Sequence, residues 1–380
     1  MSTFSGMMWL CLAVTAALGI VLCKLKKSPG QVGSKVACLV GLWGGAYLFS
    51  PSLFWGLMLF LLSCLLMCTY FSSQEFLPVD QKAVLITGGD SGFGHALSKY
   101  LDQLGFTVFV GVLHEKGPGA EELRRTCSER LSVLQMDITD SQQIKDAHSK
   151  VVEKLQNRGL WALVNNAGII GLPADGELVP MTNYKQCMAV NFFGAVEVTK
   201  TFLPLLRKSK GRLVNISSMA GGVPFEKMAA YSSSKAALTM FSAILRQELS
   251  QWEVKVSVIQ PGGFRTNISG TPETWSKLER DILDNLTPEV LEDYGQDYIL
   301  GQLDFLKIIS RSGSPDVSPV LRDIRHAVSA KRPCALYSPG PMAFPMLCFV
   351  SFSPTGIFDY FNKKMCHFTG GVPKALTKQA

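Results

Sequence analysis

The first 80 residues of this 380-residue chain contain very little charge. Of the 37 Lys and Arg and 30 Asp and Glu residues, only Lys24, Lys26, Lys27, Lys35, Glu75 and Asp80 lie there. This scarcity excludes an ordinary water-soluble domain, whose surface needs many charged side chains. The chain therefore divides into an apolar segment, residues 1–80, and a body of about 300 residues, which is long enough to enclose its own core.

The chain also lacks the residue patterns of a metal site and of a nucleic-acid site. Its 10 cysteines contain no CxxC pair, and its 5 histidines are scattered. The net charge of +7 forms no basic run beyond Lys24–Lys27. Because a zinc site needs closely spaced ligands and nucleic acid needs a basic stripe, we expect no metal and no nucleic-acid partner.

Two long uncharged runs lie in the N-terminal segment. Residues Phe4–Cys23 are numerous enough to cross roughly 30 Å of hydrocarbon as a helix, and Lys24 follows them directly. A signal peptide would carry its positive charge before the apolar run. Residues Val36–Gln74 are also uncharged and have room for one or two further spans. We expect a membrane anchor over residues 1–80, with the number of spans and the side of the body left open.

In the body, short apolar runs alternate with amphipathic stretches. The runs are Ala83–Ile86, Phe106–Leu113, Leu131–Met136, Trp161–Val164, Arg212–Ile216 and Val254–Ile259. Continuous apolar runs are typical of strands buried on both faces of a parallel sheet. The pattern predicts a doubly wound α/β fold of the Rossmann type over residues 81–340, followed by an apolar extension over residues 341–380.

A glycine-rich loop lies between the first predicted strand and the next helix. It runs from Thr87 to Gly94 and includes Asp90, Ser91 and Phe93. In this context Gly88 allows a tight turn, Gly92 lets the backbone approach a pyrophosphate, and Gly94 lets the helix pack closely on the strand. The free N–H groups at the start of the helix would bind the phosphates. The loop predicts dinucleotide binding.

The choice between NAD and NADP depends on charge near the adenine ribose. The acid that often follows the second strand of an NAD site is absent, since Val112, Leu113 and His114 occupy this position. No Arg or Lys that could bind a 2′-phosphate occurs before Lys116. Asp90 in the glycine loop would repel that phosphate, so we expect NAD.

Tyr231 and Lys235 lie four residues apart, on one face of a predicted helix. A tyrosine hydroxyl is a poor base at neutral pH, but a nearby ammonium favours the phenolate, so we expect Lys235 to lower the pKa of Tyr231. Ser218 follows a predicted strand, and its hydroxyl can reach the same substrate oxygen. Alone, the Tyr–Lys pair could also belong to an ordinary surface helix.

Taken together, these residues resemble the short-chain dehydrogenase/reductase family. The glycine loop, the Asn165–Gly168 turn, the Tyr231–Lys235 pair and Pro261–Gly262 occur in the family's order, over roughly Lys82 to Pro339. The resemblance implies a catalytic tetrad of Asn191, Ser218, Tyr231 and Lys235. In it Tyr231 is the base for the alcohol proton, Ser218 orients the substrate oxygen, Lys235 also holds the nicotinamide ribose, and Asn191 positions a proton-relay water.

The resemblance also implies a set of cofactor contacts. They are Gly88, Asp90, Ser91, Gly92, Phe93, Gly94, Asp137, Asn165, Ala167, Gly168, Tyr231, Lys235, Pro261, Gly262 and Thr266. Asp137 matches the position near the adenine, and Thr266 matches the one that holds the carboxamide. Ser218 and Tyr231 would contact the substrate. The helices that carry Asn191 and Tyr231 commonly form a dimer interface in this family, which implies a homodimer.

The substrate must be an alcohol or its ketone, because a hydride and a proton leave together, and a membrane anchor favours a lipophilic one. The segments Leu77–Val84, Gly119–Cys127 and Tyr184–Asn191 are similar to the family's 17β-hydroxysteroid dehydrogenases of the endoplasmic reticulum membrane. This similarity implies NAD-dependent oxidation of estradiol, testosterone and 20α-dihydroprogesterone. The apolar residues Leu336–Val350 could line the steroid pocket, or Met342–Val350 could simply be core.

Two other functions remain as alternatives. Retinol dehydrogenases and 11β-hydroxysteroid dehydrogenases resemble this chain in the loop Asp90–Gly94. A membrane-tethered NAD sensor or scaffold would need no turnover. A protein without catalytic activity has no physical need to keep Tyr231 and Lys235 paired, which argues against the second alternative.

Overall fold

The computed structural model describes residues 75–270, 272–302, 304, 308, 311, 313–365 and 371–377. Residues Met1–Glu75 and Phe76–Ala380 form separate compact units. The predicted spans, Phe4–Cys23 and those within Val36–Gln74, lie outside the described residues. The sheet and its helices all belong to the second unit.

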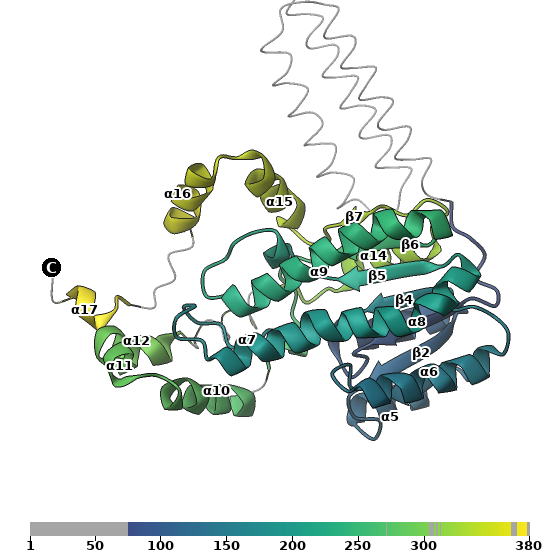
Figure 1. Ribbon diagram of the computed structural model, residues 1–380, viewed down its shortest axis with the longest axis horizontal. Helices are drawn as coiled ribbons and strands as arrows, with labels where there is room; N and C mark the ends of the chain where they lie inside the picture. The colour runs from purple at the N-terminus through teal and green to yellow at the C-terminus, as the bar shows by residue number, and fades with distance from the viewer. Residues whose placement is uncertain are drawn as a thin grey trace, which may run out of the picture. The chain divides into compact units, whose positions relative to one another are not determined.

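The centre of the body is a parallel sheet of seven strands in the order β3-β2-β1-β4-β5-β6-β7 (Figure 1). The strands are β1 (Ala83–Thr87), β2 (Thr107–Val112), β3 (Leu131–Gln135), β4 (Ala162–Asn165), β5 (Arg212–Ile216), β6 (Lys255–Ile259) and β7 (Leu336–Tyr337). Strands β1, β4 and β5 are buried at every position, as their continuous apolar runs predict.

Helices cover both faces of this sheet. On one face are α4 (Gly92–Gln103), α5 (Pro118–Thr126) and α14 (Ser318–Ser329), and on the other are α6 (Ser141–Leu155), α8 (Ala195–Ser209) and α9 (Ala229–Glu248). Each layer has its own apolar core, with Leu97 and Ile324 in the first and Ile144 and Phe202 in the second. The arrangement confirms the predicted doubly wound fold.

Further short elements connect these strands and helices and continue to the C-terminus. They are α7 (Met181–Met188), the π-helix η2 (Ala189–Gly194), η3 (Met219–Gly221), η4 (Leu249–Trp252), η5 (Asn267–Ser269), α10 (Pro272–Asp284), α11 (Pro288–Tyr294), α12 (Gln296–Gly301), α15 (Ala343–Phe352), α16 (Thr355–Met365) and α17 (Lys374–Thr377). Figure 1 shows α10, α11 and α12 grouped at one end of the body, and α15 and α16 standing away from the sheet.

Two details differ from the sequence-based expectations. Strand β7 was not predicted, because it has only two residues and exists through pairing with β6, where Gln260 N donates to Tyr337 O at 2.7 Å. The stretch Met342–Val350 is not core, since α15 buries only Ala343 among its residues. Helix α5 begins at Pro118, whose fixed backbone angle suits a first helical turn.

One helical run among the described residues, Met181–Ser209, is long and apolar enough to cross a membrane. It comprises α7, η2 and α8. Val198, Phe202 and Leu206 on this run are fully buried in the core beside the sheet. This packing is that of a core helix, so the run does not replace the predicted N-terminal anchor.

Candidate active site

A cleft of about 580 Å³ opens at the carboxyl ends of the strands. This edge of a doubly wound sheet is where such folds bind ligands. Of the predicted site residues, the cleft is lined by Gly88, Asp90, Ser91, Gly92, Phe93, Asp137, Ala167, Gly168, Ser218, Tyr231, Lys235, Pro261, Gly262 and Thr266. Three predicted residues, Gly94, Asn165 and Asn191, do not line it.

The glycine loop follows β1 and begins α4. Gly88 has a positive φ of 68°, and a Cβ atom there would lie 2.7 Å from the Cα of Ala167. A Cβ on Gly94 would lie 2.2 Å from the carbonyl oxygen of Gly88. Gly92 also has a positive φ, of 60°, but a Cβ there would meet nothing closer than Thr266 at 3.4 Å. The loop therefore needs glycine at positions 88 and 94 for close packing, while position 92 leaves space over the helix N-terminus.

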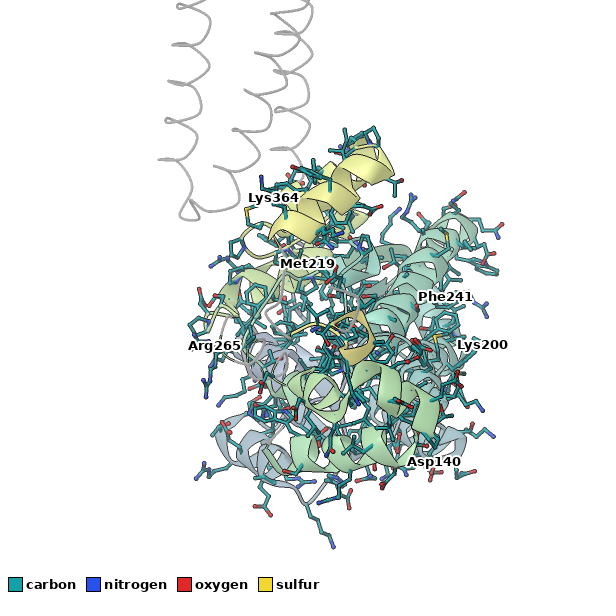
Figure 2. All side chains as sticks on the ribbon, turned by 90° about the vertical axis from the view of Figure 1, so that its left-hand side faces the viewer. Asp140, Lys200, Met219, Phe241, Arg265 and Lys364 are labelled. Carbon is teal, nitrogen blue, oxygen red and sulfur yellow. The ribbon has the colours of Figure 1, made fainter. Side chains whose placement is uncertain are left out.

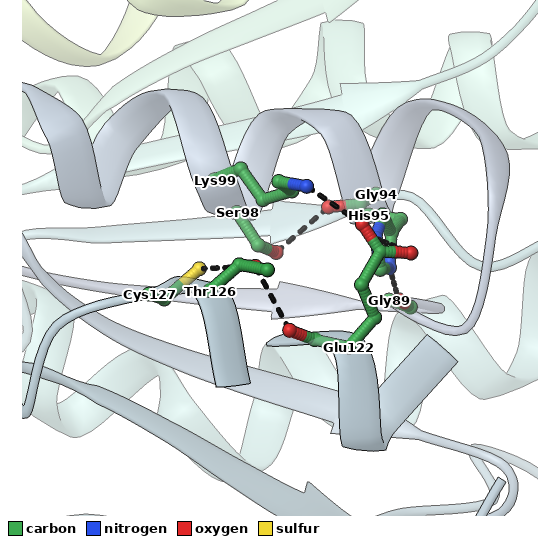
Figure 3. Close-up of polar contacts among 8 residues, drawn as sticks. All are labelled: Gly89, Gly94, His95, Ser98, Lys99, Glu122, Thr126 and Cys127. Atoms are coloured by element: carbon green, nitrogen blue, oxygen red, sulfur yellow. Dashed lines mark hydrogen bonds and ion pairs between the residues drawn. The ribbon is translucent and has the colours of Figure 1, made fainter. Parts of the chain in front are cut away.

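Polar side chains of α4 and α5 support this loop from behind (Figure 3). His95 forms a hydrogen bond with the carbonyl oxygen of Gly89 at 3.2 Å, and Ser98 donates to that of Gly94 at 2.7 Å. Glu122 of α5 lies 2.6 Å from Lys99 Nζ and 3.4 Å from His95 Nε2. His95 was not among the predicted site residues, because nothing in the sequence shows that position 95 faces back toward the loop.

Asp90 connects the glycine loop to the end of β2. Its carboxylate accepts hydrogen bonds from the backbone N–H groups of Leu113, at 2.9 and 3.1 Å, and of His114, at 3.3 Å. The sequence has no acid directly after β2, but folding brings this carboxylate to the same place. A negative charge therefore lies beside the position where an acid of an NAD site usually stands.

The structure corrects the assignment of Asn165 as a cofactor contact. Its side-chain amide points into the core and donates to Thr199 Oγ1 and to Asn215 Oδ1, both at 2.8 Å. The next residue, Asn166, lines the cleft instead and donates to the carbonyl oxygens of Thr87 and Gly88. Because side chains alternate along a strand, only one of two neighbouring asparagines can face the cleft.

Asn191 lies in η2, and its side chain forms hydrogen bonds with the backbone of Ile169 in the neighbouring loop. Its Oδ1 accepts from Ile169 N at 2.8 Å, and its Nδ2 donates to Ile169 O at 2.8 Å and to Ser234 Oγ at 2.9 Å. The amide thus holds the segment that follows Gly168, which lines the cleft. The π-helix itself was not predicted; such turns are rare and are frequent at functional sites.

Ser218, Tyr231 and Lys235 reach one wall of the cleft. Ser218 follows β5, and its Oγ accepts from Ala220 N at 3.1 Å. Lys235 Nζ donates to Ile216 O at 3.0 Å and lies 5.8 Å from the centre of the Tyr231 ring. Tyr231 and Lys235 are both buried in α9, one turn apart. The pattern Tyr–x–x–x–Lys therefore places both groups as the helical spacing predicts.

The pKa of Tyr231 differs from the expectation that Lys235 would lower it. Burial raises the pKa of Tyr231 to about 12, although a hydrogen bond with Ser218 acts in the opposite direction. Burial also lowers the pKa of Lys235 to about 8. Both groups are removed from water, and the loss of hydration disfavours the phenolate and the ammonium alike. At neutral pH the protein alone holds a neutral phenol beside a mostly charged lysine.

Tyr231 belongs to a cluster of buried apolar residues. This cluster includes Leu172, Leu178, Met228, Ile282 and Ile299, and it contains Tyr231 itself. Helices α10 and α12 contribute to it. These five residues are buried core and do not line the cleft, whose apolar lining includes Val190 and Ile268 instead.

The cleft fits a dinucleotide on geometry alone. The helix N-terminus of α4 and the space over Gly92 suit a diphosphate, and Lys235 Nζ would lie 3.1 Å from a Cβ atom at Gly168. A side chain at position 168 would therefore crowd the Lys235 ammonium. Glycine at this position keeps that wall open.

Known proteins are similar to this chain in sequence and fold. Residues 82–277 match the family described as short chain dehydrogenase. The chain is 65% identical over 379 residues to 17-beta-hydroxysteroid dehydrogenase type 2 from Homo sapiens, covering 99% of this chain and 97% of that one. It is 44% identical over 304 residues to 11-beta-hydroxysteroid dehydrogenase type 2 from Bos taurus, covering 79% and 74%.

A solved structure agrees with these sequence matches. The crystal structure of a short-chain dehydrogenase from Streptomyces avermitilis covers 75% of this chain and 94% of its own, with a TM-score of 0.58 and 25% identity. The predicted resemblance is thus confirmed over the body and, against the human relative, over almost the entire chain. The chain belongs to the short-chain dehydrogenase family.

Proposed function

We propose that this protein is a membrane-bound, NAD-dependent dehydrogenase of 17β-hydroxysteroids. Its reactions would be the oxidation of estradiol to estrone, of testosterone to androstenedione and of 20α-dihydroprogesterone to progesterone. The observation that carries the proposal is the meeting of Ser218, Tyr231 and Lys235 on one wall of the dinucleotide cleft. The relatives support the substrate class, since one 58% identical over 371 residues is named estradiol 17-beta-dehydrogenase 2, from Rattus norvegicus.

When bound, the nicotinamide cofactor supplies the acceptor for a hydride. The chain supplies the proton chemistry. Ser218 Oγ orients and polarises the substrate oxygen, and Tyr231, once it has lost its own proton, takes the alcohol proton on its phenolate Oη. Because burial opposes the phenolate, the charge on Lys235, held by Ile216 O, has to stabilise it at the moment of transfer. Asn191 holds the segment after Gly168 through the backbone of Ile169, and its proposed further role is to position a water that relays the proton outward.

Asp90 favours NAD over NADP. Its carboxylate lies beside the backbone N–H groups that follow β2, and a 2′-phosphate placed near it would meet a like charge. Asp137 lines the same cleft and is the proposed neighbour of the adenine, and Thr266 is the proposed partner of the carboxamide.

The N-terminal residues 1–80 would anchor the enzyme in the endoplasmic reticulum membrane, where a lipophilic substrate dissolves. The body would form a homodimer through the helices that carry Asn191 and Tyr231. Exposed apolar side chains on these helices support this second point: Phe193 on η2 and Met240 and Ile244 on α9. An exposed apolar patch of this kind commonly marks an interface.

A substrate competition separates this function from its alternatives. The purified full-length protein is supplied with saturating NAD and with estradiol, an 11β-hydroxysteroid or retinol, and the products are identified by chromatography. We expect estradiol to give the highest kcat/KM. Preference for the 11β-hydroxysteroid or retinol would reassign the substrate, and NAD binding without turnover of any of the three would indicate a sensor or scaffold.

A further inference from the structure

Helix α15 has an unusual combination of composition and exposure. Its 10 residues, AFPMLCFVSF, include no charged side chain, yet only Ala343 is buried. At its end, Phe352 is 87% exposed. A helix that is apolar all round is normally found inside a protein or in contact with lipid. Residues 344–350 are half-buried and Ser351 and Phe352 are exposed, so the described part of the chain covers α15 only in part and leaves an apolar surface open to a further partner.

Helix α16 packs against α15 and has a polar end. Phe358 is buried, and the ring of Phe349 lies 6.0 Å from that of Phe358 and 5.3 Å from that of Phe361. On the outside, Ile357 and Tyr360 are exposed. We name α15 and α16 together, Ala343–Met365, the C-terminal hairpin.

The charges of the hairpin are confined to α16. They are Asp359, Lys363 and Lys364, all exposed, and the two lysines lie in the last turn of the helix. Figure 2 shows Lys364 on the yellow hairpin, at the outside of the body. An apolar surface next to lysines is typical of a segment that lies in a membrane interface, with the long side chains reaching the phosphate groups.

The hairpin lies directly against the turn that holds Ser218. A Cβ atom at Gly222 would lie 2.7 Å from Leu347 Cδ2, and one at Gly262 would lie 3.4 Å from Ala343 Cβ. Met219, which follows Ser218, is labelled in Figure 2 between the hairpin and the body. Gly262 lines the cleft, so the hairpin touches the outer side of the cleft wall.

The chain itself favours a bilayer as the partner of this surface. Its uncharged runs, Phe4–Cys23 and Val36–Gln74, end just before the body begins at Phe76. A body tethered this closely to a membrane has lipid within reach. In a symmetric dimer through the hairpin, Lys363 and Lys364 could meet their own copies, an unfavourable contact of like charges, whereas phosphate groups of lipids would neutralise them.

We propose that the C-terminal hairpin is a second membrane-contact site, which places α15 in the apolar layer of a phospholipid bilayer and forms the entrance through which a lipophilic substrate reaches Ser218. The lipid contact stands independently of the enzyme's substrate. The role as an entrance rests on the proposed function.

Photocrosslinking in the full-length protein tests the lipid contact. The protein carries p-benzoylphenylalanine in place of Phe352 or Tyr360 and is reconstituted in phosphatidylcholine vesicles with a minor share of phosphatidylserine. The control carries it in place of Trp252, which is 49% exposed on η4. We expect about tenfold more lipid adduct from the two hairpin positions than from position 252. Adducts to a second copy or to residues 1–74, or lipid adducts no more abundant than at position 252, would overturn the proposal.

Steady-state kinetics tests the entrance. In the variant with Phe352→Asp and Ile357→Asp, we expect the KM for estradiol delivered in vesicles to rise about tenfold, with kcat and the KM for NAD unchanged. The control is Val152→Asp, an exposed apolar residue of α6 on a different part of the body. An unchanged KM, or a fall in kcat, would contradict an entrance role. If the wild type oxidises no steroid, the proposed function fails while the crosslinking result still decides the lipid contact.

Discussion

The ammonium of Lys235 donates a hydrogen bond to the carbonyl oxygen of Ile216 at 3.0 Å, which joins α9 to the end of β5. This hydrogen bond holds the lysine side chain in place without help from a cofactor. It also compensates in part for the loss of water around a buried cation, whose pKa burial lowers to about 8. The proposed base, Tyr231, thus has a lysine beside it whose position depends on the sheet.

Replacing Tyr231→Phe should lower the rate of steroid oxidation by about 10²- to 10⁴-fold, the usual contribution of a general base. NAD binding should remain nearly intact, because Lys235 keeps its bond to Ile216. Turnover is measured with estradiol, and NAD affinity by calorimetry on the same protein. Unchanged turnover in this variant would reject Tyr231 as the base.

Steroid oxidation should become faster as the pH rises from about 6 to about 8. Burial raises the pKa of Tyr231 to about 12, so each increase in pH enlarges a small fraction of phenolate. Above about pH 8 the rise should flatten, because Lys235 begins to lose the charge that stabilises the phenolate. Initial rates at saturating NAD give the profile, and Tyr231→Phe is the control without a rise. A fall in rate from pH 6 to 8 would show that another group limits the reaction.

Asp90→Asn should shift the cofactor preference toward NADP. The substitution removes the negative charge near the proposed 2′-position but keeps an oxygen that can accept from Leu113 N. We expect the ratio of kcat/KM for NADP to that for NAD to rise by about tenfold or more. Faster turnover with NADP than with NAD in the unaltered protein would refute the role given to Asp90.

Gly94→Ala should abolish NAD binding, whereas Gly356→Ala should leave it unchanged. The added methyl at position 94 would lie 2.2 Å from Gly88 O, while one at Gly356 meets nothing within 4 Å. Since backbone atoms of the loop have to move in the first variant, the phosphate site is lost. Calorimetry with NAD measures both, and circular dichroism checks that both fold. Normal affinity in folded Gly94→Ala would show that the loop does not hold the diphosphate.

Asn165→Ala should destabilise the body without a direct effect on the cleft. The change removes the donor to Thr199 and Asn215 inside the core, at a cost of about 1–3 kcal/mol in the free energy of unfolding. Denaturant unfolding of the full chain in detergent measures the cost. Gln142→Ala, which removes a hydrogen bond to Asp146 on the surface, serves as the control. A larger effect on NAD affinity than on stability would return Asn165 to the cofactor site.

Much of the body could be predicted from residue patterns that act locally. The six apolar runs correspond to β1 to β6, since an uninterrupted apolar strand has to be covered on both faces. The glycine loop and the Tyr231–Lys235 spacing are equally local, because a strand followed by a helix, or one turn of a helix, is enough to place them. These features together indicated the family.

Other features depended on contacts between residues far apart in the chain. The position of Asp90 beside Leu113, the inward direction of Asn165 and the pairing of β7 with β6 all arise when separate strands and helices meet. The raised pKa of Tyr231 follows from burial by several elements, and the partial exposure of α15 from its incomplete cover by the described residues. Sequence alone thus determined the strands, the phosphate loop and the reactive pair. Only the tertiary structure decided which side chains are buried and which of them face the cleft. Both properties depend on what packs against a residue in space rather than on its neighbours in the chain.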